Sequence, residues 1–188
     1  MELKKEINKP RYVVVKLKVS STVKAFDCGD ADLNEFILRE SPLYQKEKLA
    51  VTYVMKEATD IDNEHIVAFF SLANDRISIS DFDSKTKYNR FSRKFNNRKR
   101  LKSYPAVKVV RLGVNQPEKG NGLGGALLDF IKNFYTIDNK AGCRFITVDA
   151  YAAAVPFYIH NGFMPLNDED INDPTRLLYF DLNELNED

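Results

Sequence analysis

The sequence has few cysteines and no long apolar run, and these shortages exclude several classes of protein. Its two cysteines, Cys28 and Cys143, lie far apart and match no metal-ligand spacing, so we expect neither a disulfide framework nor a bound metal. No apolar run approaches the length of a membrane span. The opening MELKKEINKP lacks the apolar core of a signal peptide. The sequence therefore predicts a globular cytoplasmic protein with no membrane segment.

Charge is unevenly distributed along the chain. The formal net charge is +1, yet Ser84–Tyr104 holds nine of the 28 Lys and Arg residues and no Asp or Glu. The rest of the chain has 19 basic and 27 acidic residues, a net charge of −8. A basic segment on an acidic body indicates either a solvated insertion or a surface for a polyanion.

Alternating and β-branched patterns predict six strands, and three amphipathic runs predict helices. The expected strands are 11–19, 49–57, 65–73 (which RISIS extends), 106–114, 144–150 and 175–182. Helices are expected after a cap at Asp30, after the glycines that follow Val114, and over AAAVPFYIHNGF, which Gly162 closes. The expected fold class is α+β (mixed α/β). We expect one domain over residues 1–188, with a mixed central sheet of six to seven strands flanked by helices and a basic insertion at about 81–105.

Four glycines within six residues separate the strand ending at Val114 from the next helix. Gly120, Gly122 and Gly125 fit the dinucleotide pattern G-x-G-x-x-G, but five residues stand between Val114 and Gly120, where that fold has a tight turn. The phosphate loop G-x-x-x-x-G-K-[ST] is absent. Glycines at a helix N-terminus, with Lys119 beside them, favour an anion. The alternative is a tight connection without a ligand.

Two motifs together resemble the GNAT N-acetyltransferase superfamily. Residues 119–124, KGNGLG, fill its phosphate loop [Q/R]-x-x-G-x-[G/A], with Lys119 where Gln or Arg is usual. The second signature, A-x-x-F-Y-x-x-x-G-F, is matched by Ala154, Phe157, Tyr158, Gly162 and Phe163. Tyr151 departs from the family by occupying a position often held by Asn or Ser.

The resemblance implies transfer of an acetyl group from acetyl-CoA to a primary amine. The residues it implies for the cofactor are Leu112, Gly113, Val114, Lys119, Gly120, Asn121, Gly122, Leu123, Gly124 and Gly125. Tyr158 becomes the candidate general acid, because a phenol stays protonated at neutral pH; the alternative is a core tyrosine. No base stands out among Asp75, Asp149 and His160, and deprotonation through water remains open.

The acceptor amine is the least determined part of the prediction. FDCGDADLNEFI resembles the GNAT-type toxins that acetylate aminoacyl-tRNA. Tyr and Phe residues interleave with the basic residues of Ser84–Tyr104, which is typical of nucleic-acid binding. Arg98, Lys99 and Arg100 are therefore the candidate tRNA contacts. The alternatives are aromatics packed on the body, a peptide or small-molecule acceptor, and a degenerate GNAT fold that only binds. A homodimer and an antitoxin partner are also left open.

Overall fold

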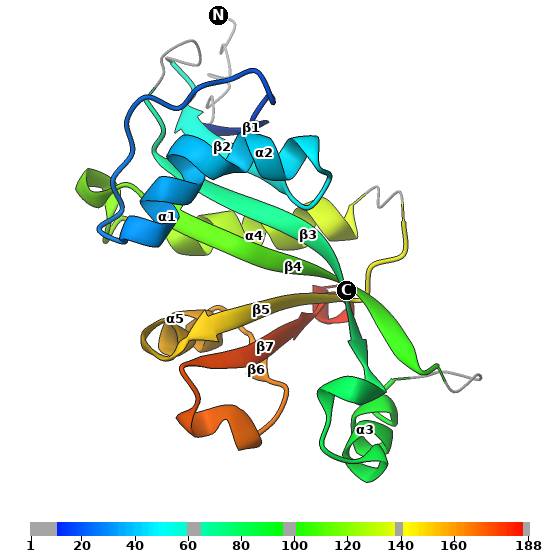
Figure 1. Ribbon diagram of the computed structural model, residues 1–188. Coiled ribbons are helices and arrows are strands. Elements are labelled where there is room, and N and C mark those ends of the chain that lie inside the picture. Colours follow the sequence, from blue (N-terminus) through cyan, green and yellow to red (C-terminus); the bar gives the residue numbers. More distant parts are fainter. Residues whose placement is uncertain (1–10, 60–64, 96–100, 138–140, 186–188) are drawn as a thin grey trace, which may run out of the picture. The chain divides into compact units, whose positions relative to one another are not determined.

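The computed structural model describes residues 11–59, 65–95, 101–137 and 141–185 (Figure 1). The strands are β1 (Tyr12–Lys16), β2 (Val51–Glu57), β3 (Ala68–Ser78), β4 (Ser103–Val114), β5 (Phe145–Tyr151), β6 (Met164–Pro165) and β7 (Thr175–Asp181). The α-helices are α1 (Ala31–Glu35), α2 (Ser41–Lys46), α3 (Lys85–Ser92), α4 (Leu123–Thr136) and α5 (Val155–His160). A π-helical stretch, Phe36–Glu40, joins α1 to α2.

The seven strands form one mixed sheet in the order β1-β2-β3-β4-β5-β7-β6. β4 and β5 run parallel from Ala106↔Phe145 to Lys108↔Thr147, whereas β7 pairs antiparallel with all seven residues of β5. The expected mixed α/β fold with a sheet of six to seven strands is confirmed. Each expected strand forms within a few residues of its predicted bounds, and RISIS extends β3. The two-residue strand β6 and the helix α3 were not predicted as elements.

Contacts divide the chain into two compact units. The first comprises Met1–Ser71 and Arg111–Gly124, and the second comprises Leu72–Val110 and Gly125–Asp188, so that β3 and β4 run through both. The expectation of a single domain over residues 1–188 stays a prediction.

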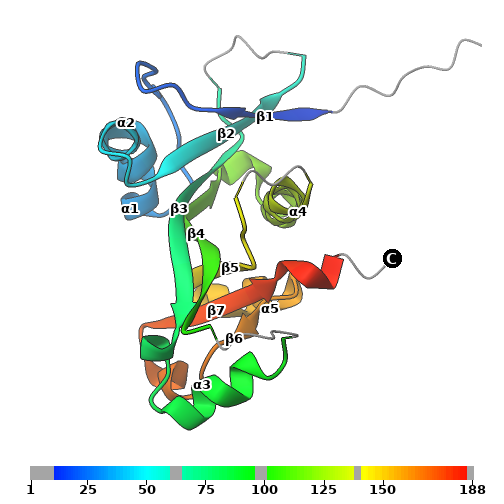
Figure 2. The ribbon, with the colours of Figure 1, turned by 90° about the vertical axis from the view of Figure 1, so that its right-hand side faces the viewer.

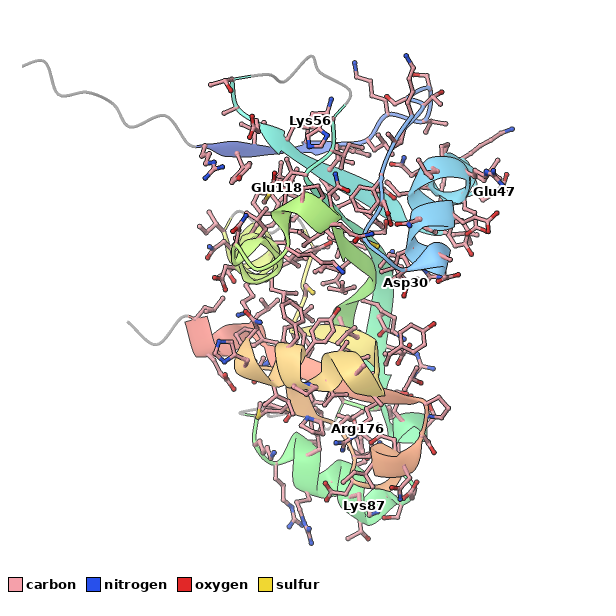
Figure 3. The ribbon with its side chains drawn as sticks, turned by 90° about the vertical axis from the view of Figure 1, so that its left-hand side faces the viewer. Asp30, Glu47, Lys56, Lys87, Glu118 and Arg176 are labelled. Atoms are coloured by element: carbon pink, nitrogen blue, oxygen red, sulfur yellow. The ribbon has the colours of Figure 1, made fainter. Side chains whose placement is uncertain are left out.

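The core of the first unit forms where the segment from α1 to α2 packs beside β2 (Figures 1 and 2). Asp30 caps α1 as expected, because its carboxylate accepts a hydrogen bond from the Leu33 amide at 3.1 Å (Figure 3). This start directs Phe36 inward, where its ring centroid lies 6.3 Å from that of Phe69. Phe26, which precedes the cap, meets Phe69 edge-on at 5.2 Å. The loop before α1 is thereby anchored to β3.

Aromatic side chains build the core of the second unit. Ser84 caps α3, and the following turns place Tyr88 and Phe91 in the interior. The Phe91 ring lies 5.6 Å from Phe145 on β5 and 5.4 Å from Tyr179 on β7. The aromatic residues of the basic segment are therefore packed on the body, as the alternative prediction held, while the cations of α3 are exposed. This corrects the expectation that its aromatics stack on bases, since those described are buried or half-buried in this cluster.

Candidate functional site

The glycine loop leaves its backbone accessible. After β4, a short turn over Gln116–Glu118 leads to Gly120 and Gly122, whose φ angles are +82° and +75°. A Cβ added to either glycine would meet nothing within 4 Å, so no packing contact requires them. Their positive φ is the conformation that favours glycine. An extended ligand can therefore approach this backbone directly.

The loop leads into α4, which begins at Leu123. Lys119, Asn121 and the two positive-φ glycines are exposed, while Leu123 is buried and anchors the first turn. The first amides of a helix have no intrahelical acceptor, and the helix dipole adds partial positive charge there. With the ammonium of Lys119, these groups can bind a pyrophosphate. The placement of these residues is consistent with the prediction, while their role stays a prediction.

At two of the predicted cofactor glycines, close packing leaves no room for a larger side chain. A Cβ on Gly113 would lie 2.8 Å from the Phe69 ring, inside the core of the first unit. A Cβ on Gly125 would lie 3.0 Å from Oδ1 of Asn161, where α4 passes the end of α5. Close packing explains both glycines without a ligand. Leu112 and Val114 flank Gly113 in β4 and are half-buried.

A polar network that the sequence analysis missed fixes the start of the loop. Asp27 accepts hydrogen bonds from the side-chain amide of Gln116 at 2.7 Å and from the backbone amide of Gly29 at 2.8 Å. The Gly29 hydrogen bond is the largest cause that lowers the pKa of Asp27, followed by that from Asn34. The only local signal of this network was the string FDCGD, because Asp27 and Gln116 are 89 positions apart.

Tyr158 lies on α5, which has Pro156 in its first turn and ends before Gly162 at φ +84°. Its ring is buried edge-on against Phe157 at 5.0 Å and Phe163 at 5.4 Å. This burial raises the pKa of Tyr158 to about 12. Among the described residues, its hydroxyl has no hydrogen-bond partner, and the hydroxyl oxygen is not completely buried. Tyr158 thus presents a protonated, unpaired donor.

Of the three candidate bases, the two carboxylates are paired with a lysine and the histidine is exposed. Lys108 Nζ lies 2.8 Å from a carboxylate oxygen of Asp149 and 3.7 Å from one of Asp75. Burial alone would lower the pKa of Lys108, but the two carboxylates outweigh it and raise that pKa. Asp75 also accepts a hydrogen bond from Thr147. His160 is exposed at the end of α5. Neither carboxylate is an unpaired base.

The predicted tRNA contacts Arg98, Lys99 and Arg100 lie outside the described residues. Earlier in the basic segment, α3 and the turn after it expose five cations. They are Lys85, Lys87, Arg90, Arg93 and Lys94. Lys87, which Figure 3 labels on α3, forms an exposed ion pair with Asp83 at 3.1 Å. Within the described ranges, no group of three or more His, Cys, Asp and Glu residues could hold a metal ion, and no helix is long and apolar enough to cross a membrane.

Comparison with known proteins shows which family part of this chain resembles. Residues 97–180 match the family model described as acetyltransferase (GNAT) domain. This part of the chain therefore resembles a GNAT acetyltransferase domain, and the resemblance predicted from the two motifs is confirmed.

The chain is also similar to individual proteins. A curated protein of Sinorhizobium fredii (strain NBRC 101917 / NGR234), "Probable toxin TacT", is 27% identical over 151 residues, which cover 76% of this chain and 77% of that protein. The structure of AtaTR bound with AcCoA is 22% identical, with a TM-score of 0.72 over 94% of this chain and 96% of that one. AtaT complexed with acetyl-methionyl-tRNAfMet is 21% identical, with a TM-score of 0.73 over 93% and 97%. At these identities the structures establish a shared fold.

AtaT has also been solved as a mutant toxin bound to the C-terminus of the antitoxin AtaR. That structure is 18% identical to this chain and covers 94% of it and 97% of AtaT, with a TM-score of 0.71.

Proposed function

We propose that this protein uses acetyl-CoA to acetylate the amine of an aminoacyl-tRNA. The observation that carries the proposal is the GNAT domain match at residues 97–180 in a chain that resembles a probable toxin over 76% of its length. The AtaT fold, which this chain shares, has been observed with acetyl-CoA and with an acetylated aminoacyl-tRNA. The alternatives are a peptide or small-molecule acceptor.

The glycine loop fits the pyrophosphate of acetyl-CoA. The space that a Cβ would fill at Gly120 and Gly122 is open, which permits close backbone approach. In this proposal the loop amides and the first amides of α4 bind the pyrophosphate oxygens, and Lys119 neutralises part of their charge. The backbone of Leu112–Val114 holds the acetyl and pantetheine portions. The thioester supplies an activated acetyl group, and the protein orients it.

Tyr158 serves as the proton-bearing partner of the leaving sulfur. Its pKa of about 12 keeps it protonated at neutral pH. An ordinary thiol has a pKa of about 8.5, so complete proton transfer from Tyr158 to the thiolate would be uphill by roughly 5 kcal/mol. We therefore assign to Tyr158 a hydrogen bond that strengthens as negative charge develops on sulfur, with water carrying the proton that the amine releases. A hydrogen bond to a charged group contributes about 1.5–3 kcal/mol.

This assignment predicts the effect of Tyr158→Phe. The variant removes one hydroxyl that has no partner among the described residues, so stability should change little. Turnover should fall by about 10- to 10²-fold, which corresponds to the loss of a hydrogen bond of about 1.5–3 kcal/mol to the developing charge, while the KM for acetyl-CoA stays nearly constant. Release of the CoA thiol, followed with wild type and variant, measures both parameters. Unchanged turnover would show that Tyr158 is a core residue alone.

The decisive assay compares acceptors. Thiol release from acetyl-CoA is measured with a panel of aminoacyl-tRNAs, the same amino acids as free amides, and a short peptide. We expect turnover with at least one aminoacyl-tRNA and little with its amino acid amide. Equal rates with the amide would assign a small-molecule acceptor. Thermal unfolding with acetyl-CoA at 100 times its Kd should show about 2.7 kcal/mol of stabilisation; a stabilised protein that releases no thiol would be a binding module.

The cations of α3 supply a second test of the acceptor. The variant Arg90→Gln/Arg93→Gln/Lys94→Gln removes three exposed charges of the basic segment. Association with aminoacyl-tRNA should weaken, and its log–log salt slope should become shallower by about 0.7–0.9 for each phosphate that the variant no longer neutralises. The matched control neutralises Lys16, Lys18 and Lys46, three exposed cations outside the basic segment. Equal weakening in both triple variants would indicate nonspecific attraction.

An antitoxin partner follows from the same resemblance. AtaT binds the C-terminus of its antitoxin AtaR, and the same arrangement here would restrain an enzyme that removes charged tRNA from translation. Expression of this chain alone should arrest growth in the host, and coexpression of an adjacent gene product should restore it. Arrest that persists with Tyr158→Phe would separate growth inhibition from acetylation. The homodimer stays a prediction.

A further inference from the structure

One residue, Asp27, joins two segments that are far apart in the sequence through its carboxylate and its backbone. Asp27 lies just before α1, and Asn115 and Gln116 follow β4. Gln116 donates twice to Asp27, from its side-chain amide to Oδ2 at 2.7 Å and from its backbone amide to the carbonyl oxygen at 2.8 Å. The Asp27 amide donates to Oδ1 of Asn115 at 3.2 Å. Three hydrogen bonds therefore join these segments side by side.

The other oxygen of the carboxylate is held from the side of α1. Oδ1 of Asp27 accepts from the backbone amide of Gly29 and from the side-chain amide of Asn34, each at 2.8 Å. Asn34 in turn accepts a hydrogen bond from the Cys28 amide at 2.8 Å. Both carboxylate oxygens are thus oriented, and the lowered pKa of Asp27 keeps the group ionised at neutral pH.

Backbone hydrogen bonds connect Asn115 and Gln116 to the start of the loop. The Glu118 amide donates to the Asn115 carbonyl at 2.9 Å, and the Lys119 amide donates to the Gln116 carbonyl at 3.2 Å. These two bonds close the turn, so the position of Gln116 sets that of Lys119. Lys119 Nζ and the Gln116 side chain both lie over Gly29, at 3.8 and 3.6 Å from the place of its missing Cβ.

We infer that Asp27 is a positioning residue for the pyrophosphate-binding loop, Lys119–Gly124. The inference rests on the proposed use of acetyl-CoA and extends it to a residue outside both family motifs. Without Asp27, the turn that carries Lys119 loses its side-chain anchor, and the loop must be ordered when pyrophosphate binds. The ordering costs free energy that the wild-type protein has already supplied on folding.

The charge of Asp27 has the opposite effect on an anion. A carboxylate near a pyrophosphate site repels the ligand, and its removal would favour binding. Three donors and the attraction of Lys119 oppose this repulsion, and exposed charges are strongly screened. We therefore expect the loss of order to outweigh the relief of repulsion. The sign of the change in affinity decides between the two effects.

The test compares two acetyl donors. Acetyl-pantetheine has the thioester and the pantetheine arm of acetyl-CoA but lacks the pyrophosphate. Asp27→Ala should raise the KM for acetyl-CoA by about tenfold, the lower value for one hydrogen bond to a charged group. The kcat/KM for acetyl-pantetheine should stay within about twofold of wild type, because that donor does not bind the loop. Gln116→Ala should reproduce the selective loss.

Asp30→Ala is the matched control. Asp30 lies in the same loop as Asp27, and its carboxylate accepts a hydrogen bond from Leu33 while its carbonyl accepts one from Cys28. Both partners belong to the side of α1, so these bonds do not extend to residues 115–119. Loss of this helix cap should destabilise the protein by about 1 kcal/mol. The ratio of kcat/KM for acetyl-CoA to kcat/KM for acetyl-pantetheine should not change. A general weakening of the fold would lower activity with both donors equally.

A ligand-free measurement separates this inference from the proposed function. In the absence of any donor, amide hydrogen exchange at residues 116–122 should quicken in Asp27→Ala and stay at the wild-type rate in Asp30→Ala. If wild type uses neither donor, the proposed function fails, yet faster exchange would still support Asp27 as the anchor of the loop. Unchanged exchange, an unchanged donor ratio, or tighter binding of acetyl-CoA to Asp27→Ala would overturn the inference.

Discussion

Replacement of Lys132 tests how α5, the helix that carries Tyr158, is held in place. Lys132 lies on α4 with only 10% of its side chain exposed. Its ammonium donates to the carbonyl of Asn161 at 2.9 Å and lies 4.6 Å from the centroid of the Phe180 ring. Asn161 also donates from its side chain to the Phe157 carbonyl at 2.8 Å. A buried cation therefore binds the C-terminal end of α5, where the helix dipole is negative.

The magnitude follows from these interactions. Lys132→Met keeps a flexible side chain of similar length and removes the charge. It loses a hydrogen bond from a charged group, about 1.5–3 kcal/mol, and a partly desolvated cation–π interaction of about 1–2 kcal/mol. The exposed pair with Asp129 contributes at most about 0.5 kcal/mol. Relief from burying an ammonium offsets part of this loss. We expect a net destabilisation of about 2 kcal/mol, or roughly 4–8 °C in Tm.

Urea unfolding measures this loss, with Asp129→Asn as the control. That control removes only the exposed partner and should change stability by less than about 0.5 kcal/mol. Turnover of Lys132→Met should also fall, because the end of α5 is less firmly held, while the KM for acetyl-CoA should change less. Stability equal to wild type would refute the reasoning, since it would mean that the cost of burying the ammonium cancels its hydrogen bond and its interaction with the ring.

Two further predictions concern the glycines. Gly113→Ala should destabilise the protein by about 1–3 kcal/mol in urea unfolding, because the added Cβ would lie 2.8 Å from the buried Phe69 ring; Gly142→Ala, whose Cβ meets nothing within 4 Å, should be neutral by comparison. Gly122→Val should leave the fold intact and weaken acetyl-CoA binding at least tenfold in calorimetry, because a branched side chain at φ +75° strains the loop and blocks backbone approach. Wild-type affinity in the folded Gly122→Val variant would contradict the site assignment.

The sequence predicts the elements and the two motifs well because their signals are local. Apolar periodicity marks α4, and the cap at Asp30 and the closure at Gly162 depend on residues within a few positions. A glycine, however, can be required at a position for more than one physical reason. Gly120 and Gly122 have positive φ and open surroundings, whereas Gly113 and Gly125 face a ring and an amide that belong to distant segments. The motif alone could not separate these two kinds.

Long-range polar contacts are the part that the sequence could not supply. Asp27 and Gln116 are both common surface residue types, and their pairing is set by how the loop before α1 meets the end of β4. Lys108 is similar, because its charge is balanced by carboxylates on β3 and β5 that no spacing along the chain connects. Periodicity reports which face a residue occupies, but not which distant residue it meets there.

In the basic segment, the composition was identified correctly, but the predicted stacking of its aromatic side chains on bases was wrong. On α3, Tyr88 and Phe91 point into the aromatic core while Arg90 is exposed, so one helix separates the rings from the cations. The Tyr88 hydroxyl is also engaged, because it donates to the Leu101 carbonyl at 2.6 Å. Base stacking on these rings would require the core to open. If this surface binds tRNA, these rings take no part in base stacking, and phosphate contacts by the exposed cations predict strong salt dependence. Under the proposed function, selection of the acceptor then depends on contacts with the charged amino acid.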